Sequence, residues 1–190
     1  IIEEGAELET IDKIAETMAM VAKEAKVKIV AGDTKVIEGN GGIYINTSGI
    51  GEIVRNGVSI SNCRIGDVIL LSGNLGEHHA AILSERMGID NQITSDCAPL
   101  NSIVADLIKD KIAVHCMRDV TRGGLATVLN EAADNSSCAV ELWEESLPVS
   151  SEVQGFCDIL GLDPLYMANE GKMIAVVPEN QAEKALRTMQ

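Results

Sequence analysis

The chain has 190 residues, which at about 150 residues per domain allows one large domain or two small ones. Its hydrophobic content of 46% excludes global disorder, whereas an aromatic content of 2% nearly excludes base-stacking platforms for single-stranded nucleic acid. A total of 15 Lys and Arg against 29 Asp and Glu gives a net charge of -14, the wrong sign for binding a phosphate backbone. No apolar run reaches about 18 residues, so we expect no transmembrane helix.

The first part of the chain is predicted to contain one helix and two strands. Apolar side chains recur on one helical face over residues 7–25, which predicts an amphipathic helix. Residues 27–31 form a short β-rich segment, and residues 43–54, which follow a glycine-rich turn, form a second. The second of these strands is apolar, and an exposed edge of this kind favours pairing with another chain.

A polar segment over residues 55–64 separates two differently patterned apolar regions and contains the turn signal Asn56-Gly57. We therefore predict a partial N-terminal domain over residues 1–58 and a C-terminal α/β domain over residues 65–190. Helices and strands alternate along the chain, which is typical of an α/β or α+β architecture in two layers. In the second domain, strands are predicted at 67–72, 112–117, 138–142 and 173–177, and helices at 76–87, 97–108, 123–134, 150–160 and 180–188.

The cysteines do not form a metal-binding or disulfide pattern. Their number is odd and no C-x-x-C pair is present, which suits reduced thiols in the cytoplasm better than a disulfide framework. We expect each of them to be a small core residue rather than a reactive group. They are Cys63, Cys97, Cys116, Cys138 and Cys157.

Four polar clusters stand at the predicted ends of strands, and the first is Gly32-Asp33-Thr34-Lys35. Gly32 allows close backbone approach, Thr34 adds a donor, and Asp33 and Lys35 suit Mg²⁺ and phosphate, respectively. The alternative interpretation is a polar turn closed by an Asx-type hydrogen bond. The cluster is not a P-loop, because G-x-x-x-x-G-K-S/T occurs nowhere in the chain.

The second cluster, Ser72–His79, is a predicted strand-to-helix turn with glycines at positions 73 and 76. A helix N-terminus binds anions, and His78 is suited to donate to a phosphate or to move a proton. The alternative is a glycine-containing helix start with surface histidines. Adjacent His78 and His79 cannot chelate a metal from one helical face, so the pair does not predict a metal site.

The third cluster, Met117–Gly124, lies between a predicted strand and a predicted helix. Asp119 or Thr121 is suited to cap a helix that begins near Gly123, which is the structural interpretation. Two arginines beside exposed helix N–H groups, in a chain this acidic, favour an anion-binding site instead.

The fourth cluster, Ala168–Lys172, interrupts a hydrophobic segment with charged residues. Such a cluster either makes a hairpin turn or presents a carboxylate at the edge of a site. In the second interpretation Glu170 is a candidate general base or metal ligand.

Together, the four clusters resemble, in order and spacing, the HypE family of hydrogenase maturation factors. Ser95–Ala98 and Leu147–Val149 fit the same pattern, and the resemblance covers essentially the whole chain. The family belongs to the ATP-binding superfamily of aminoimidazole ribonucleotide synthetase, selenophosphate synthetase and thiamine-monophosphate kinase. The resemblance therefore implies a two-domain α/β (α+β) fold of the aminoimidazole ribonucleotide synthetase type, with an incomplete N-terminal domain here.

The resemblance also implies a reaction. A carboxamide on the thiol of a C-terminal cysteine is dehydrated, with consumption of ATP, to a thiocyanate that supplies the cyanide ligand of nickel–iron hydrogenase. An amide oxygen is a poor leaving group until it is phosphorylated, so ATP, Mg²⁺ and the carboxamide must be brought together. A base must then remove the nitrogen protons, and Glu170 and His78 are both candidates.

The implied assembly is a cytoplasmic homodimer that pairs through the N-terminal domain and binds neither nucleic acid nor membrane. Its implied partners are the carbamoyltransferase HypF and the HypC–HypD iron-carrier complex. The sequence begins Ile-Ile-Glu-Glu, without the acidic opening segment of the family, and ends without its Pro-Arg-x-Cys tail. We expect a piece of a longer enzyme that is inactive by itself, with His79 where the family usually has Gly.

Two alternatives stay open at this point: another ATP-dependent enzyme of the superfamily, such as a small-molecule kinase or cyclo-ligase, or a non-catalytic interaction module. The sequence Asp33-Thr34-Lys35 argues against the first of these.

The site residues implied by the resemblance are Lys35, Glu170 and His78 for catalysis, Gly32, Asp33, Thr34, Arg118, Asp119, Thr121, Arg122 and Asn169 for ATP, and Asp33 also for the metal.

Overall fold

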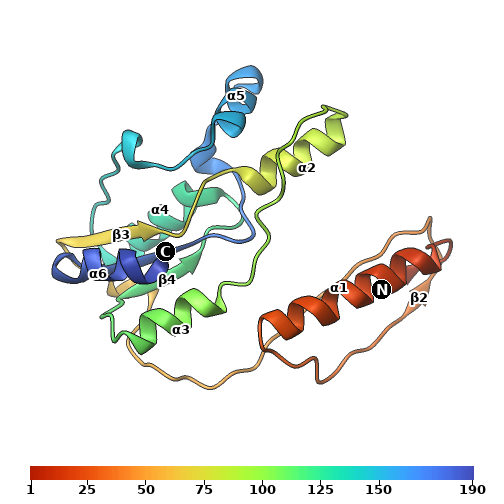
Figure 1. The fold of residues 1–190 in the computed structure, drawn as a ribbon, viewed down its shortest axis with the longest axis horizontal. Helices are drawn as coiled ribbons and strands as arrows, with labels where there is room; N and C mark the ends of the chain where they lie inside the picture. The colour runs from red at the N-terminus through yellow and green to blue at the C-terminus, as the bar shows by residue number, and fades with distance from the viewer. The chain divides into compact units, whose positions relative to one another are not determined.

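The computed structural model describes residues 1–190, which form two compact units, Ile1–Val54 and Arg55–Gln190 (Figure 1). In the first unit, helix α1 spans Leu8–Glu24, which confirms the helix predicted over residues 7–25. Short strands β1 (Ile2–Glu3) and β2 (Val36–Ile37) pair in parallel beside it. No helix in the structure is both long enough and apolar enough to cross a membrane.

The two strands predicted in the first unit are wrong in extent. Residues 27–31 pair with no other segment, and strand β2 forms only after the glycine-containing cluster, at Val36. In the second segment Ile43 makes one isolated bridge to Ile2, and Tyr44 exchanges two backbone hydrogen bonds with Ile1. Residues 45–54, including the fully exposed Ile50, are unpaired. β-branched composition favours an extended backbone, but a strand requires a neighbour that accepts its hydrogen bonds.

Glu3 organises the loop that follows β2. Its carboxylate accepts hydrogen bonds from the backbone N–H groups of Asn40 (2.8 Å) and Gly42 (3.0 Å) and from the hydroxyl of Tyr44 (3.2 Å). These donors, those of Asn40 and Gly42 above all, hold the pKa of Glu3 below its ordinary value, because they stabilise the ionised form.

The second unit is built on a three-stranded antiparallel sheet in the order β3-β5-β4, with β3 at Asp67–Leu71, β4 at Cys116–Asp119 and β5 at Met173–Pro178. Strands predicted at 67–72 and 173–177 are therefore confirmed. The strand predicted at 112–117 begins later, at Cys116. The strand predicted at 138–142 is wrong, because this segment pairs with no strand.

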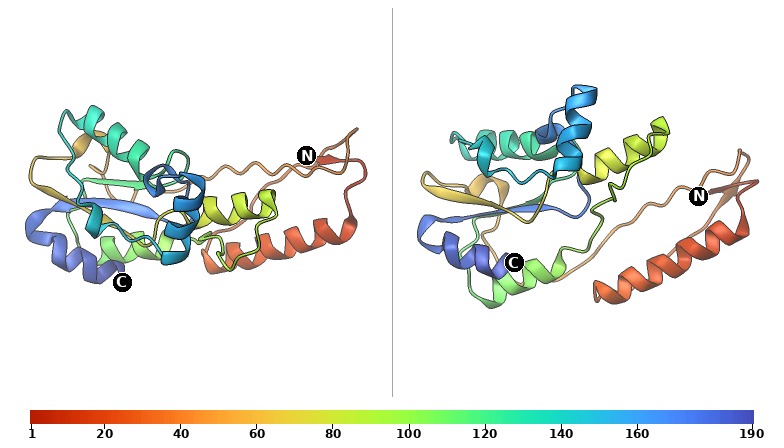
Figure 2. Two further views of the ribbon diagram at one scale, coloured as in Figure 1. Left: turned by 90° about the horizontal axis from the view of Figure 1, so that it is seen from above. Right: turned by 45° about the horizontal axis from the view of Figure 1, so that its top comes forward.

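Strand β5 is central and buried on both faces. Its residues Ile174 and Val176 pack with α4 on one face, and Ala175 and Val177 pack with α3 and α6 on the other. Figures 1 and 2 show this layering of α4, sheet and the α3–α6 pair. The alternation follows from the period of two residues in a strand. The helices are α2 (Glu77–Met87), α3 (Asn101–Lys109), α4 (Gly124–Ser136), α5 (Ser151–Leu160) and α6 (Glu179–Met189).

Four of the five helices in this unit begin within a residue of the prediction, and α3 is the exception. It was expected from residue 97 and begins at Asn101, after Pro99. A residue that precedes proline is driven away from the helical conformation, so the helix starts beyond it. Short 3-10 turns complete the unit at Ile60–Asn62, Glu144–Ser146 and Pro164–Tyr166.

A third apolar cluster joins α2 to α5 and to the loop before β5. It contains Val153, Phe156 and Cys157 of α5 together with Met167. Burial raises the pKa of the Cys157 thiol, and nearby Asp158 and Asp163 add to the shift. Burial also raises the pKa of Cys116 in the sheet to about 12, with the neighbouring Cys63 contributing.

Candidate functional site

Asn169 lies at the junction of three polar loops in the second unit. It is fully buried. Its Oδ1 accepts a hydrogen bond from the N–H of Gly76 (2.8 Å), and its Nδ2 donates to the carbonyl oxygens of Val120 (2.9 Å) and Met167 (3.1 Å). One amide therefore ties the β3–α2 turn, the β4–α4 loop and the loop before β5 together, so the second, third and fourth sequence clusters meet.

The β3–α2 turn is fixed further by backbone contacts to the loop before β5. Gly76 has a φ of +84° at the start of α2, a conformation that favours glycine. The N–H of His79 donates to the carbonyl of Ala168 (3.1 Å), and the N–H of Ala168 donates to Nδ1 of His79 (3.4 Å). His79 thus pairs with the neighbouring loop on both its backbone and its side chain.

A partly buried charge network lies beneath Glu170. The Asp96 side chain is 1% exposed, and its Oδ1 accepts a hydrogen bond from the N–H of Glu170 (2.9 Å). Its Oδ2 has no hydrogen-bond partner and lies 3.8 Å from Nζ of Lys172, which lies 3.4 Å from Oε2 of Glu77. A buried carboxylate needs a nearby cation, and Lys172 supplies one. The network holds the backbone of Glu170 while leaving its carboxylate exposed and unbonded.

Sequence reasoning missed Asp96 and Lys172 as site residues. Both stand inside segments that the family pattern singled out, Ser95–Ala98 and Ala168–Lys172. The signal available in the sequence was a charged residue inside each short polar motif, which indicates a structural partner but does not identify it.

Gly171→Ala is expected to destabilise the chain by about 1–3 kcal/mol, the usual cost of forcing extra atoms into a packed site. A Cβ at this position would overlap the carbonyl oxygen of Asp96 and lie 2.8 Å from the N of Ala98. Urea unfolding measures the change. Gly155→Ala in α5 is the matched control, because nothing lies within 4 Å of its Cβ, and it should be neutral or stabilising. Equal stability of the two variants would contradict the close packing.

His78 lies beside a serine and a cysteine from the segment before α3. Its Nδ1 is 2.8 Å from Oγ of Ser95, which is 3.1 Å from Sγ of Cys97. The ring nitrogen and the sulfur are 3.8 Å apart. Cys97 is exposed, so the prediction that every cysteine is a core residue is wrong for it.

The β4–α4 loop differs from its predicted capping. The N-cap of α4 is Gly123, with φ +79° and no side-chain hydrogen bond, so neither Asp119 nor Thr121 caps the helix. Thr121 Oγ1 donates instead to Asp119 (3.3 Å). Arg118 pairs with Glu131 on α4 (2.9 Å), whereas Arg122 is exposed and makes no hydrogen bond or ion pair.

The cluster Gly32–Lys35 belongs to the other unit, Ile1–Val54. It is exposed and has no regular secondary structure. The carbonyl of Lys35 accepts a hydrogen bond from the N–H of Ile2 (2.9 Å), but the side chains of Asp33, Thr34 and Lys35 make no hydrogen bond or ion pair. The Asx-type turn considered from the sequence is therefore absent. No group of three or more His, Cys, Asp or Glu side chains in the structure is placed to hold a metal.

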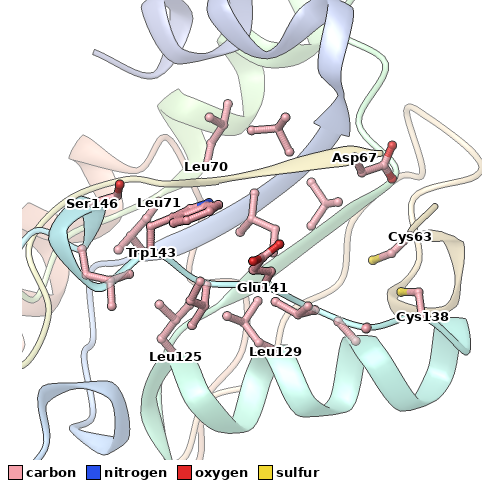
Figure 3. Close-up of a pocket in the computed structure, with 18 of the residues that line it drawn as sticks. Cys63, Asp67, Leu70, Leu71, Leu125, Leu129, Cys138, Glu141, Trp143 and Ser146 are labelled. Atoms are coloured by element: carbon pink, nitrogen blue, oxygen red, sulfur yellow. The ribbon is translucent and has the colours of Figure 1, made fainter. Parts of the chain in front are cut away.

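A cavity of about 710 Å³ opens between β3, α4 and the segment 138–148 (Figure 3). Apolar side chains such as Leu71, Leu125 and Leu129 form most of its wall, and Glu141 and Trp143 line it from the segment that was predicted to be a strand. None of the predicted site residues lines this cavity. We place the candidate site at the polar loops, because they carry the carboxylates, the imidazole and the helix N-termini that chemistry requires.

Residues 64–190 match the family described as AIR synthase related protein, C-terminal domain, and the chain belongs to that family. Over its whole length it is similar to hydrogenase maturation proteins. It is 46% identical over 193 residues to a putative hydrogenase expression/formation protein of Methanocaldococcus jannaschii, and 47% identical over 195 residues to carbamoyl dehydratase HypE of Cupriavidus necator. These alignments cover 100% of this chain and 57% and 55% of the relatives, so the chain spans just over half their length.

Solved structures agree with the sequence relatives. A crystal structure of HypE in complex with ATP aligns with a TM-score of 0.94 and 43% identity, covering 99% of this chain and 58% of the other. A HypE–HypF complex aligns with a TM-score of 0.89 and 42% identity, covering 99% and 63%. The predicted resemblance and the predicted aminoimidazole ribonucleotide synthetase-like fold are confirmed.

Proposed function

We propose that the protein to which this chain belongs dehydrates a thiol-bound carboxamide to a thiocyanate at the expense of ATP, and so supplies cyanide for nickel–iron hydrogenase. The observation that carries the proposal is the exposed carboxylate of Glu170 on a backbone held by buried Asp96, in a chain similar throughout to carbamoyl dehydratase HypE. An unbonded carboxylate on a fixed backbone suits a general base, because the group is positioned yet free to take a proton.

Glu170 is the better candidate for the base that removes the nitrogen protons. Its carboxylate makes no hydrogen bond or ion pair, whereas Nδ1 of His78 is already engaged by Ser95. We therefore assign proton removal to Glu170. His78 belongs instead to the separate group of contacts with Ser95 and Cys97.

We assign ATP binding to two sets of residues, Gly32–Lys35 and the loop from Arg118 to Arg122 with Asn169. A HypE structure in complex with ATP supports the binding of ATP. When bound, ATP supplies the phosphoryl group that turns the amide oxygen into a leaving group. Arg122 and Lys35 have uncommitted cationic side chains for phosphate, while Asn169 acts through the backbone it fixes.

Mg²⁺ is commonly held in proteins by one or two carboxylates together with phosphate oxygens. Asp33 offers one such carboxylate, exposed and without a hydrogen bond, which fits an ion held mainly by the nucleotide. We therefore propose Asp33 as the metal ligand contributed by this chain.

We further propose that the protein is a cytoplasmic homodimer with domains at residues 1–58 and 65–190. The exposed apolar residues of the 43–54 segment support pairing through the first domain. HypF is the proposed carbamoyl-transferring partner, supported by the solved HypE–HypF complex, and the HypC–HypD complex is the proposed acceptor of cyanide.

Glu170→Gln in the full-length protein is expected to lower cyanide formation by at least about 10²-fold, the low end of the effect of general-base catalysis. ATP binding, measured by calorimetry, should be unchanged, because the amide retains the shape of the side chain. Glu145→Gln, at an exposed position in a 3-10 turn, is the matched control and should retain full turnover. Normal turnover of Glu170→Gln together with loss in His78→Gln would transfer the role of base to His78.

A further inference from the structure

We propose that Cys97, Ser95 and His78 form a reactive-thiol site that takes a small carbon electrophile. The site is distinct from the assigned roles of Glu170 and the ATP-binding residues. It joins a nucleophile, a hydroxyl and an imidazole in one continuous line of contacts, at 3.1 Å from sulfur to hydroxyl and 2.8 Å from hydroxyl to ring nitrogen.

The serine hydroxyl has one proton, and we consider two states, in which it is donated to Nδ1 of His78 or, as at the 3.1 Å contact, to Sγ of Cys97. In the first, the Cys97 thiol donates to Ser95 Oγ and the Ser95 hydroxyl donates to Nδ1 of neutral His78. In the second, Nδ1–H of His78 donates to Ser95 Oγ, and the Ser95 hydroxyl donates to the Cys97 thiolate. A shift of both protons along the line converts one state into the other. The serine is therefore a relay that lets the imidazole act as base for the thiol.

The relay is held in place by elements outside it. His78 stands in the first turn of α2, and Ser95 and Cys97 flank Asp96, the residue whose buried carboxylate binds the N–H of Glu170. The N–H of Cys97 also donates to Ser95 Oγ (3.3 Å), which fixes the serine relative to the cysteine. A reactive side chain keeps its geometry when hydrogen bonds fix the segment that carries it.

Cys97 differs from the four other cysteines in exposure. Cys116 and Cys157 are buried, and Cys63 and Cys138 are partly buried. A buried thiol fills space in a core and is chemically inert, whereas Cys97 is accessible and has a base within reach. Cys97 belongs to none of the three hydrophobic clusters, so core packing does not account for its placement.

The chemical step balances within the site. The Cys97 sulfur attacks an electrophilic carbon and forms a new carbon–sulfur bond. The bond from that carbon to its leaving group breaks, and the leaving group departs with the electron pair. The thiol proton passes through Ser95 to His78, which returns to the neutral state by releasing it to water or to the leaving group. The step requires neither ATP nor metal.

The rate of alkylation of Cys97 by iodoacetamide at pH 7 tests the proposal, measured in the full chain by peptide mass spectrometry. An unassisted thiol is only a few per cent thiolate at pH 7, so His78→Gln and Ser95→Ala should each lower the rate by about tenfold. Ser95→Thr keeps the hydroxyl and should keep the rate. Glu85→Gln, exposed on the same helix as His78, is the control and should also keep it.

The buried Cys157 reports folding in the same sample, because it should stay unlabelled in every folded variant. Alkylation of Cys97 that is unchanged in His78→Gln, with Cys157 still protected, would overturn the proposal. So would equal loss of reactivity in Ser95→Ala and Ser95→Thr, since the relay requires the hydroxyl alone.

Discussion

Lys35→Ala in the full-length protein is expected to lower cyanide formation by about 10²–10³-fold, the usual cost of removing one group that stabilises developing charge. The chain carries a net charge of -14, which repels phosphates at long range, so binding and stabilising them depends on local cations. The Lys35 side chain is exposed and makes no hydrogen bond or ion pair, so the free energy of unfolding should change by less than about 0.5 kcal/mol. Cyanide release and urea unfolding measure the two effects.

Lys28→Ala is the matched control for this prediction. Lys28 is also exposed and lies in the same irregular segment, and its replacement by Ala removes the same charge from the chain. It should leave turnover within about twofold of the unmodified protein, as expected for surface positions away from a site. Equal losses in Lys28→Ala and Lys35→Ala would show that net charge alone is responsible, and unchanged turnover in Lys35→Ala would remove the residue from the mechanism.

Asn169→Ala is expected to lower the free energy of unfolding by about 2–4 kcal/mol. The substitution leaves two buried backbone groups, the N–H of Gly76 and the carbonyl of Met167, without their partner. The carbonyl of Val120 loses the bond from Nδ2 but keeps one from the backbone N–H of residue 169. Each unsatisfied buried group costs about 1–3 kcal/mol, so two such groups account for a loss of this size. Urea unfolding measures the change, followed by a signal from the second unit.

Two variants separate the role of the amide from a general sensitivity of the chain. Asn135→Ala removes an amide that donates to one helical carbonyl at an exposed position, and should cost less than about 0.5 kcal/mol. Asn169→Asp keeps an acceptor for Gly76 but loses both donated hydrogen bonds, so its loss should be comparable to that of Asn169→Ala. A loss below about 1 kcal/mol in Asn169→Ala would contradict its place at the junction.

Most helices of this chain were predictable because helical periodicity is a local property. Helix α1 and helix α4 were found nearly to the residue, and the delay of α3 to Asn101 follows from Pro99, which is visible in the sequence. Strands were predicted well where an apolar run is bounded by turn residues and pairs within the sheet, as in β3 and β5. The segment 138–142 has the composition of a strand and pairs with nothing, because pairing depends on a distant neighbour that composition does not specify.

The polar loops of the candidate site were predictable for a different reason. Glycine and charged residues at the ends of strands mark turns that chemistry uses, and the second, third and fourth of these meet at Asn169. The ion pair of Asp96 with Lys172 was not predictable, because the two residues are far apart in sequence. In the sequence, each of them is also indistinguishable from an ordinary surface charge. The caps assigned to Asp119 and Thr121 failed because Gly123 already provides the turn into α4.

The hydrogen bonds of the Asn169 side chain couple the positions of the three loops. Because all three loops bind the Asn169 side chain, a displacement of the turn after β3 also displaces the loop after β4 and the loop that carries Glu170. Transplanting the Glu170 loop alone into another protein of the same fold would therefore carry over the carboxylate without its geometry. The exchangeable module is the set of three loops with the asparagine that joins them, and redesign of this site should treat that set as its smallest unit.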